Sequence, residues 1–438
     1  MRGYAYMSLF TDDTKRNQLV IGAIMAAACV IYLVVVVLGD MLTEAVNFRF
    51  KDANDVFNGT APTFEYPPLA MIFVLIPRVF ASTELWYNVG FVIEMAIFFM
   101  IGLYMTCKIA EVLGKSQKIF MLAYVLLMAL MFEFVVDRYD IIPVAITLAA
   151  VYCFLTKRYT WAFVLLSLGT MIKLYPAVLF PAFIIPLIMN NEKMEALKGA
   201  IAFITVSAAI VLVTMIIQPD MLSYFIGYHA DRPLQIESVT ASLLYPFVMV
   251  GLADRSFEYS YGSENIVGPI PDAIAPWLTP LMGVCILALY VFYVYVLKKI
   301  NGRGDSNDRL YLFAGISLLA VLLFIIVGKV MSTQYLMWMI PSMIFMLMLS
   351  SDDRWAKKVF ILFAVTIIVA QAQFTLISGY MGGGEALTDP ANVILANIGM
   401  IMIIVKNVLL LFVMYLVIRS VYERYVSLKS SGSVTDEF

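Results

Sequence analysis

The residues best suited to chemistry in this chain are ionisable groups in short polar segments between long apolar runs. Asp40 ends the first apolar run. A carboxylate at the boundary of lipid and water could deprotonate a hydroxyl, because partial desolvation raises its pKa. The simpler alternative is an Asp that marks a helix end. His229, the chain's single histidine, stands beside Arg232 and Glu237 and could shuttle a proton. Asp40 and His229 are therefore the candidate catalytic residues.

Three cations are candidates for binding a phosphate group: Lys173, Arg232 and Lys329. Lys173 opens the segment KLYP, Arg232 lies in HADRPLQIES (229–238), and Lys329 lies in GKVMSTQYLMW (328–338). A cation in such a segment can neutralise a substrate phosphate. As alternatives, Lys173 could extend to lipid phosphate, and residues 328–338 could be a turn with interfacial aromatic side chains.

Further polar residues in the same segments are candidates for binding the rest of a substrate. They are Glu65, Tyr66, Arg138, Asp140, Gln235, Glu237 and Gln334. For the run from Asp137 to Asp140, the alternative is a self-neutralising charged loop followed by a helix N-cap. Lys406 and Asn407 interrupt an apolar run, and we interpret them as a buried polar pair that stabilises helix packing.

The elements that position these residues must be membrane helices. Of 438 residues, 62% are hydrophobic and 14% are charged, which leaves little sequence for a water-soluble domain. The net charge of −2, without a basic patch, argues against nucleic acid as a partner. The four cysteines fall within apolar runs without paired spacing, so we predict neither disulfides nor a metal site.

Apolar runs of sufficient length predict about twelve transmembrane helices in an all-α integral membrane protein. The runs are 19–39, 86–107, 118–136, 139–156, 159–174, 177–189, 197–217, 277–297, 309–328, 334–350, 357–378 and 395–418. Two proline-containing segments, 66–82 and 241–252, are predicted to be juxtamembrane helices on the outer face instead of spans. The first run lacks a small-residue cleavage site and is predicted to be a retained helix.

The basic residues predict sidedness, because cytoplasmic loops are enriched in Lys and Arg. Twelve spans with both termini inside place most Lys and Arg on the cytoplasmic side and the candidate site residues on the other side. We therefore expect a multi-pass cell-membrane protein with its active site on the non-cytoplasmic face. Residues 1–426 are predicted to form a single domain and residues 427–438 a short polar cytoplasmic tail.

Together, Asp40, the YPPL segment, KLYP, HADRPLQIES and GKVMSTQYLMW resemble the GT-C superfamily of membrane glycosyltransferases. Within it, the chain is most similar to polyprenol-phosphate-mannose-dependent mannosyltransferases of the phosphatidylinositol mannoside type. The resemblance implies transfer of a hexose, mannose, from a polyprenyl-phosphate sugar to a hydroxyl of a lipid or lipid-linked glycan, with inversion. It implies no metal and no cofactor besides this lipid co-substrate.

The same resemblance assigns the catalytic carboxylate to the first outer loop, at Asp40. Met41 follows Asp40, whereas some relatives carry two acidic residues in succession. The sequence leaves open whether an acidic residue further along, Glu44, Asp52, Asp55 or Glu65, assists, or whether His229 is the base.

Two other functions fit a polytopic protein: a secondary transporter, and a lipid flippase without transferase chemistry. A transporter would be expected to carry ionisable residues near the middle of the membrane. In this sequence Lys406 is the one residue that fits that expectation, so we favour the transferase.

Overall fold

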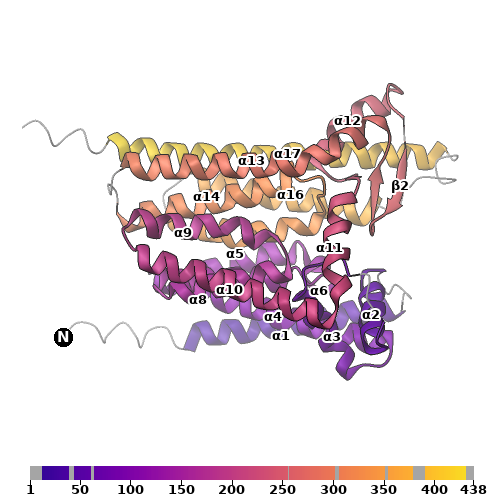
Figure 1. Ribbon diagram of the computed structural model, residues 1–438, viewed down its shortest axis with the longest axis horizontal. Helices are drawn as coiled ribbons and strands as arrows, with labels where there is room; N and C mark the ends of the chain where they lie inside the picture. Colours follow the sequence, from indigo (N-terminus) through magenta and orange to yellow (C-terminus); the bar gives the residue numbers. More distant parts are fainter. Residues whose placement is uncertain are drawn as a thin grey trace, which may run out of the picture. The chain divides into compact units, whose positions relative to one another are not determined.

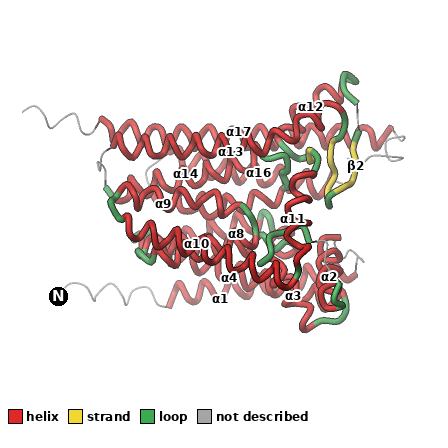
Figure 2. Tube along the Cα trace, in the orientation of Figure 1, coloured by secondary structure: helices red, strands yellow, loops and turns green. Residues whose placement is uncertain are grey.

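The computed structural model describes residues 12–38, 44–60, 64–254, 256–300, 305–350, 354–377 and 390–430. It is 84% helical, as Figures 1 and 2 show. Its contacts divide the chain into two compact units. Unit 1 comprises Met1–Ala177 and Leu197–Phe225, and unit 2 comprises Val178–Ala196 and Ile226–Phe438.

Seven helices in the described part of the chain are long and apolar enough to cross a membrane. They are Lys15–Val35 within α1 (Asp12–Leu38), α4 (Glu84–Val112), α10 (Lys193–Ile217), α13 (Pro269–Ile300), α14 (Ser306–Val327), Arg354–Thr375 within α16 (Arg354–Ile377), and Ala391–Ser430 within α17 (Pro390–Ser430). A multi-pass membrane protein is thus confirmed. The count of twelve spans and the sidedness stay predictions, because the remaining apolar helices have only 10–17 residues.

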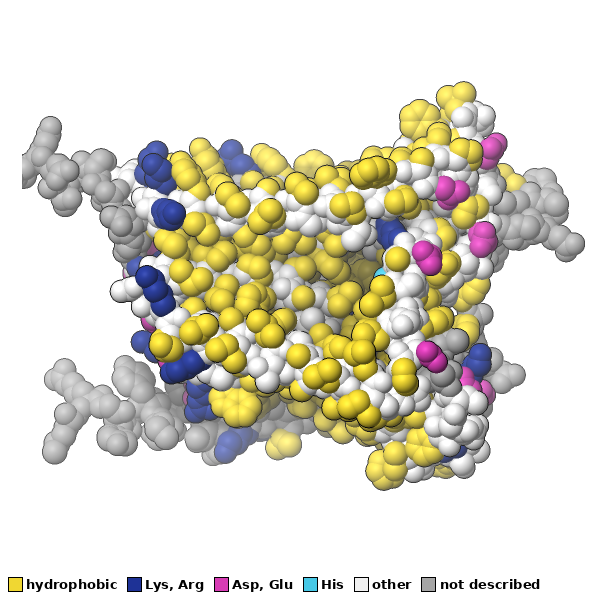
Figure 3. Space-filling view, in the orientation of Figure 1, with side chains coloured by type: hydrophobic (Ala, Val, Ile, Leu, Met, Phe, Trp, Pro, Cys, Tyr) yellow, Lys and Arg dark blue, Asp and Glu magenta, His cyan; other side chains and the backbone are white. Residues whose placement is uncertain are grey.

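Helix α13 shows the pattern of a helix that faces lipid. From Trp277 onward, its most exposed large side chains recur every three or four residues, which places them on one face: Trp277, Leu281, Val284, Leu287, Val291 and Tyr295. The stripe covers about 27 Å along the helix, close to the thickness of a bilayer's hydrocarbon core. Lys298 and Lys299 follow in the last turn. Figure 3 shows hydrophobic side chains along this helix and basic side chains at its end.

Unit 1 is built around α4. This helix packs against α1, α2 (Glu44–Phe57), α3 (Ala70–Phe80), α5 (Gln117–Ala129), α6 (Phe132–Asp137) and α7 (Ile141–Leu155), while α8 (Tyr159–Ile172) packs on α7. The predicted span 118–136 is divided, because a turn at Leu130 and Met131 separates α5 from α6. Helix α3 falls within the segment 66–82 that was predicted to be a short helix.

Unit 2 contains α9 (Phe180–Met189), α12 (Val239–Met249), α13, α14, η2 (Thr333–Met339), α15 (Ile340–Leu349), α16 and α17; α11 (Pro219–Asp231) ends in it. Helix α17 has 41 residues and is about 60 Å long, twice the hydrocarbon thickness of a bilayer. Met400 and Ile403 near its start pack with α12, the beginning of α13 and a small sheet in one hydrophobic cluster. Ser427 to Ser430, which were predicted to begin a polar tail, continue this helix.

The structure is all-α as predicted, apart from one small three-stranded antiparallel sheet. Its order is β1 (Leu234–Gln235), β3 (Ser263–Ile266) and β2 (Phe257–Ser260). Figure 2 shows it in yellow beside α12. Tyr261 and Gly262 form the turn between β2 and β3, both with positive φ, as tight hairpins require. This hairpin lies between the predicted juxtamembrane segment 241–252 and the predicted span 277–297, where the sequence analysis predicted no strand.

Gly199 in α10 tests how closely this helix packs against α8, and Gly283 in α13 serves as its control. A Cβ on Gly199 would overlap the ring of Phe163 in α8, whereas a Cβ on Gly283 in α13 would meet no atom within 4 Å. We expect Gly199→Ala to destabilise the protein by about 1–3 kcal/mol, as overpacking does. Gly283→Ala should be neutral or slightly stabilising, because Ala favours helix. Thermal unfolding in detergent measures both, and equal effects would contradict the close approach of α10 and α8.

Candidate functional site

Most of the predicted site residues, together with polar and aromatic neighbours, fall into two clusters, one in each unit. The first cluster, in unit 1, consists of Arg49, Asp52, Glu65, Tyr66, Asp137, Arg138, Tyr139, Asp140 and Lys173. The second cluster, in unit 2, consists of His229, Arg232, Gln235, Glu237, Lys329, Thr333, Gln334, Lys406 and Asn407.

A buried ion pair forms the centre of the first cluster. The Lys173 ammonium lies 3.2 Å from both carboxylate oxygens of Asp140, and both residues are buried. Asp140 directly precedes α7, but its side chain makes no capping hydrogen bond to that helix. Asp140 thus occupies the N-cap position of α7 without capping the helix, and Lys173 is buried against Asp140, which does not fit its extension to lipid phosphate. Burial lowers the pKa of Lys173, and the Asp140 carboxylate partly opposes that change.

Two tyrosine rings enclose the Lys173 ammonium. It lies 4.6 Å from the ring centroid of Tyr66 and 4.7 Å from that of Tyr139, and the two rings meet edge to face at 4.9 Å. The buried Tyr139 hydroxyl has no hydrogen-bond partner among the residues that the structure describes. A polar group of a ligand could satisfy it.

Arg49 connects α2 to the loop before α7. Its guanidinium donates to the Asp137 carbonyl at 2.8 Å and lies over the rings of Phe91 and Tyr139. Arg138 lies 3.9 Å from the Asp137 carboxylate, so these two charges partly neutralise each other, as the loop alternative proposed. The first cluster is thus held from α2, α4 and the loop before α7.

Asp52, one turn after Arg49 on α2, has the properties of a base that works near neutral pH. Its side chain is half-buried. Burial, together with the nearby charges of Glu65 and Asp55, raises the pKa of Asp52 to about 7. A carboxylate with this pKa accepts protons far more readily than an ordinary Asp.

The second cluster contains two cations close together. The Lys329 ammonium donates to the Ala230 carbonyl at 2.9 Å, in the last turn of α11. Arg232 follows that helix and donates to the Ser263 hydroxyl at 2.9 Å, while its buried Nε has no partner among the described residues. Burial, and then the charge of Arg232, lower the pKa of Lys329, while the charge of Asp231 partly opposes that change. Cations placed in this way favour an anionic ligand.

The segments around these cations run alongside each other. The Gln235 N–H donates to the Lys329 carbonyl at 3.0 Å, and the Met331 N–H donates to the Gln235 side-chain carbonyl at 2.9 Å. The Thr333 hydroxyl donates to Glu237 at 2.9 Å. The two motifs 229–238 and 328–338, separated by some 90 residues of sequence, therefore form one structural element.

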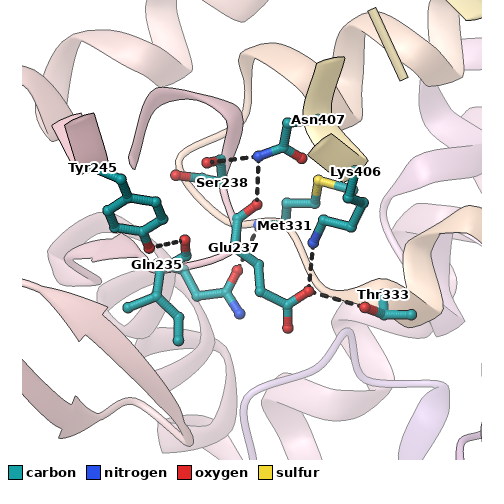
Figure 4. A network of polar contacts seen from close by, with 9 residues as sticks. Gln235, Glu237, Ser238, Tyr245, Met331, Thr333, Lys406 and Asn407 are labelled. Carbon is teal, nitrogen blue, oxygen red and sulfur yellow. Dashed lines mark hydrogen bonds and ion pairs between the residues drawn. The ribbon is translucent and has the colours of Figure 1, made fainter. Parts of the chain in front are cut away.

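Lys406 and Asn407 of α17 hold this element in place, as Figure 4 shows. Lys406 is fully buried, and its ammonium donates to Glu237 Oε2 at 2.6 Å. The Asn407 side chain donates to the carbonyls of Glu237 and Ser238 at 3.2 Å. The pair does not merely stabilise the packing of one helix on another, because both residues bind the turn that carries Glu237.

Most of the predicted site residues lie in these clusters. Asp40 lies outside the described residues. His229 is half-buried on α11, edge to face with Tyr228, and Gln334 is buried beside Thr333. The structure brings Arg232 and Lys329 together in unit 2, whereas Lys173 belongs to unit 1 and is paired with Asp140.

Sequence reasoning did not single out Arg49, Tyr139 or Thr333, and it assigned Lys406 no part in a site. A lysine within an apolar helix was the signal for the last of these, since such residues pair with a buried partner. Among the described residues, no group of three or more His, Cys, Asp or Glu side chains could hold a metal ion.

Comparison with known proteins adds one match. The family model of glycosyltransferase family 87 matches residues 64–328, more than half of the chain, and this range includes seven of the nine residues of the first cluster and four of the nine of the second. No curated protein matches the chain.

Proposed function

Since the chain belongs to glycosyltransferase family 87, a family of GT-C-type membrane glycosyltransferases, we propose that its sugar donor is a polyprenyl-phosphate hexose. The hexose is mannose, and the acceptor is a hydroxyl of a lipid or lipid-linked glycan. Transfer takes place on the non-cytoplasmic face with inversion at the anomeric carbon.

The observation that carries the choice of donor is the pair of cations Arg232 and Lys329. Lys329 is buried, and a second cation lies near it although each charge disfavours the other. An anion between such groups relieves both the desolvation and the repulsion. A lipid phosphate is the anion that a membrane-embedded glycosyltransferase meets as its leaving group.

In the proposed reaction the acceptor hydroxyl loses its proton to a carboxylate, and its oxygen attacks the anomeric carbon opposite the phosphate. The bond between that carbon and the phosphate oxygen breaks, and its electron pair stays on the oxygen. Polyprenyl phosphate leaves with a negative charge that Arg232 and Lys329 stabilise. Lys173 is already paired with Asp140, so we assign it to positioning Tyr66 and Tyr139 instead of binding phosphate.

We assign the role of general base to Asp52, supported by its half-buried position and its pKa of about 7. Asp40, outside the described residues, and His229 are the two alternatives. A base that must be deprotonated gives a rate that rises with pH up to its pKa, which makes the assignment testable.

Purified protein in nanodiscs tests the proposal with radiolabelled polyprenyl-phosphate mannose and a mixture of membrane lipids as acceptor. We expect label to move into a new glycolipid with the opposite anomeric configuration and no transfer from a nucleotide sugar. Transfer from a nucleotide sugar would refute the lipid-phosphate donor. Movement of labelled lipid across the bilayer without new glycolipid would favour the flippase alternative.

Lys329→Gln should weaken binding of polyprenyl phosphate. Loss of one charge-assisted contact worth about 1.5–3 kcal/mol corresponds to roughly 10- to 100-fold in Kd. Lys299→Gln, which removes an exposed lysine at the end of α13, is the matched control and should leave Kd unchanged. Calorimetric titration in nanodiscs measures both, and equal affinities would remove Lys329 from the phosphate site.

A further inference from the structure

The two carboxylate oxygens of Glu237 have different surroundings. Oε2 accepts hydrogen bonds from the Lys406 ammonium at 2.6 Å and from the Thr333 hydroxyl at 2.9 Å. None of the described residues donates to Oε1, and Figure 4 shows this oxygen pointing away from Lys406 and Thr333. Oε1 can therefore accept a hydrogen bond from a ligand, in a direction that the Lys406 ion pair fixes.

Gln235 offers the complementary group. Its side-chain carbonyl accepts the Met331 N–H at 2.9 Å, so the NH2 group is the part that can donate to a ligand. A turn closed by the Ser238 N–H on the Gln235 carbonyl brings Gln235 and Glu237 near each other. In Figure 4 the amide nitrogen of Gln235 and Oε1 of Glu237 point to the same side of that turn.

The charges decide what kind of ligand fits. Lys406 neutralises Glu237, so the buried pair has little net attraction for a cation. An anion is also disfavoured, because Oε1 can only accept hydrogen bonds. A neutral hydroxyl both donates and accepts, and it suits a carboxylate oxygen beside an amide NH2 group.

The location of these groups shows which hydroxyls they would meet. Arg232 stands on the same segment as Gln235 and Glu237, and Lys329 stands on the segment that hydrogen-bonds to it. A donor whose phosphate is held by the two cations would carry its sugar next to that phosphate.

We propose that Glu237 and Gln235 bind two neighbouring hydroxyl groups of the donor hexose, with Lys406 as the positioning residue for Glu237. One hydroxyl donates to Glu237 Oε1, and the next accepts from the Gln235 NH2 group. This proposal rests on the proposed function, since it assumes a lipid-phosphate hexose as donor. It makes this turn the part of the protein that selects the sugar.

Donor analogues test the proposal on the wild-type protein. Each ring hydroxyl of the polyprenyl-phosphate hexose is replaced in turn by hydrogen or by fluorine, which can accept but not donate. At the position bound by Glu237, both replacements should lower kcat/KM by about 10- to 100-fold, because a hydrogen bond to a charged group is lost. At the neighbouring position, the fluoro analogue should retain more activity than the deoxy analogue.

Two variants test whether Glu237 and Gln235 cause the differences in activity among the donor analogues. The double variant Glu237→Gln/Lys406→Met leaves no buried charge unpaired. Its new amide NH2 group can donate a hydrogen bond to fluorine. The analogue with fluorine at the position bound by Glu237 should therefore react as well as the parent sugar. Gln235→Glu keeps an oxygen that accepts the Met331 N–H but replaces the NH2 donor by a second oxygen. The analogue with fluorine at the neighbouring position, which can only accept, should then react poorly. Ser242→Ala removes a nearby buried hydroxyl of α12 and should leave both patterns unchanged.

The possible outcomes distinguish failure of the proposed function from failure of the proposed sugar site. If the wild type transfers from no lipid-phosphate sugar, the proposed function fails and this proposal fails with it. If transfer occurs but every analogue reacts like the parent sugar, or both variants keep the wild-type pattern, only the sugar site is refuted. Should the double variant not fold, Gln235→Glu and the wild-type series still decide the question.

Discussion

Replacing Asp52 by Asn is expected to lower the rate of sugar transfer by about 10²- to 10⁴-fold, the usual contribution of a general base. Asn has nearly the same shape but cannot take a proton from the acceptor hydroxyl. Wild-type kcat/KM should rise tenfold per pH unit below pH 7 and level off above it, because Asp52 titrates with a pKa of about 7. The variant should lack this rise. A fully active Asp52→Asn protein would exclude Asp52 as the base and leave Asp40 and His229.

Stability should respond in the opposite direction to activity. The pKa of Asp52 is about 7 in the folded protein against an ordinary value of 3.8, so the folded state holds a proton that the unfolded state releases. The stabilisation from that proton is complete below pH 3.8 and is lost as the pH rises through 7. Asn does not ionise, so the stability of the variant relative to the wild type should increase as the pH rises from about 4 to about 7 and stay constant above that.

Asp55→Asn is the matched control, since it removes the same charge one turn further along α2. Because Asp55 raises the pKa of Asp52, its removal should move the rising part of the pH profile to lower pH while the plateau rate persists. A loss of plateau activity in both variants would point to a structural role for α2.

Asp140→Asn is expected to destabilise the protein by about 3–5 kcal/mol, since it leaves the buried Lys173 ammonium without its carboxylate. The double variant Asp140→Asn/Lys173→Met removes the remaining charge and should recover most of that stability. Recovery should not extend to activity, because Lys173 also positions Tyr66 and Tyr139. Thermal unfolding and transfer rate measured on the same preparations give both answers.

The control for this cycle is Glu111→Gln, which breaks the exposed pair of Lys108 and Glu111 on α4. Solvent screens that pair, so the unfolding temperature should hardly change. If Asp140→Asn behaves like Glu111→Gln, the pair of Asp140 and Lys173 contributes no more than a surface contact. If the double variant is no more stable than Asp140→Asn, a buried unpaired charge is not the cause of the loss.

Local patterns in the sequence predicted most of the helices, the membrane location and the polar segments that form the two clusters. Apolar runs and proline positions are local signals, and they placed α3 and α12 correctly as short helices. The alternation in FEYS, followed by the turn residues Tyr261-Gly262, was a local signal as well, but no strand was predicted there.

The partners of the buried charges could not be predicted. Asp140 looked like a helix N-cap because it precedes α7, yet its partner Lys173 stands 33 residues away. Glu237 meets Lys406 across 169 residues of sequence. A single sequence contains no information about which distant segments meet, so it reveals that a buried lysine needs a partner without revealing which one.

Two ion pairs along the long helix α17 restrict where residues can be inserted in unit 2. Lys406 pairs with Glu237 in the middle part of the helix, and Arg424 pairs with Asp308 of α14 at 3.1 Å near its C-terminal end. The two residues are 18 positions apart, which is five turns, so they lie on the same face about 27 Å from each other. The helix is thereby anchored in register at two points, and one inserted residue between them would rotate one of these lysine or arginine side chains by about 100° away from its partner. The loops before and after α17 can vary in length, but the part of the helix from Lys406 to Arg424 cannot.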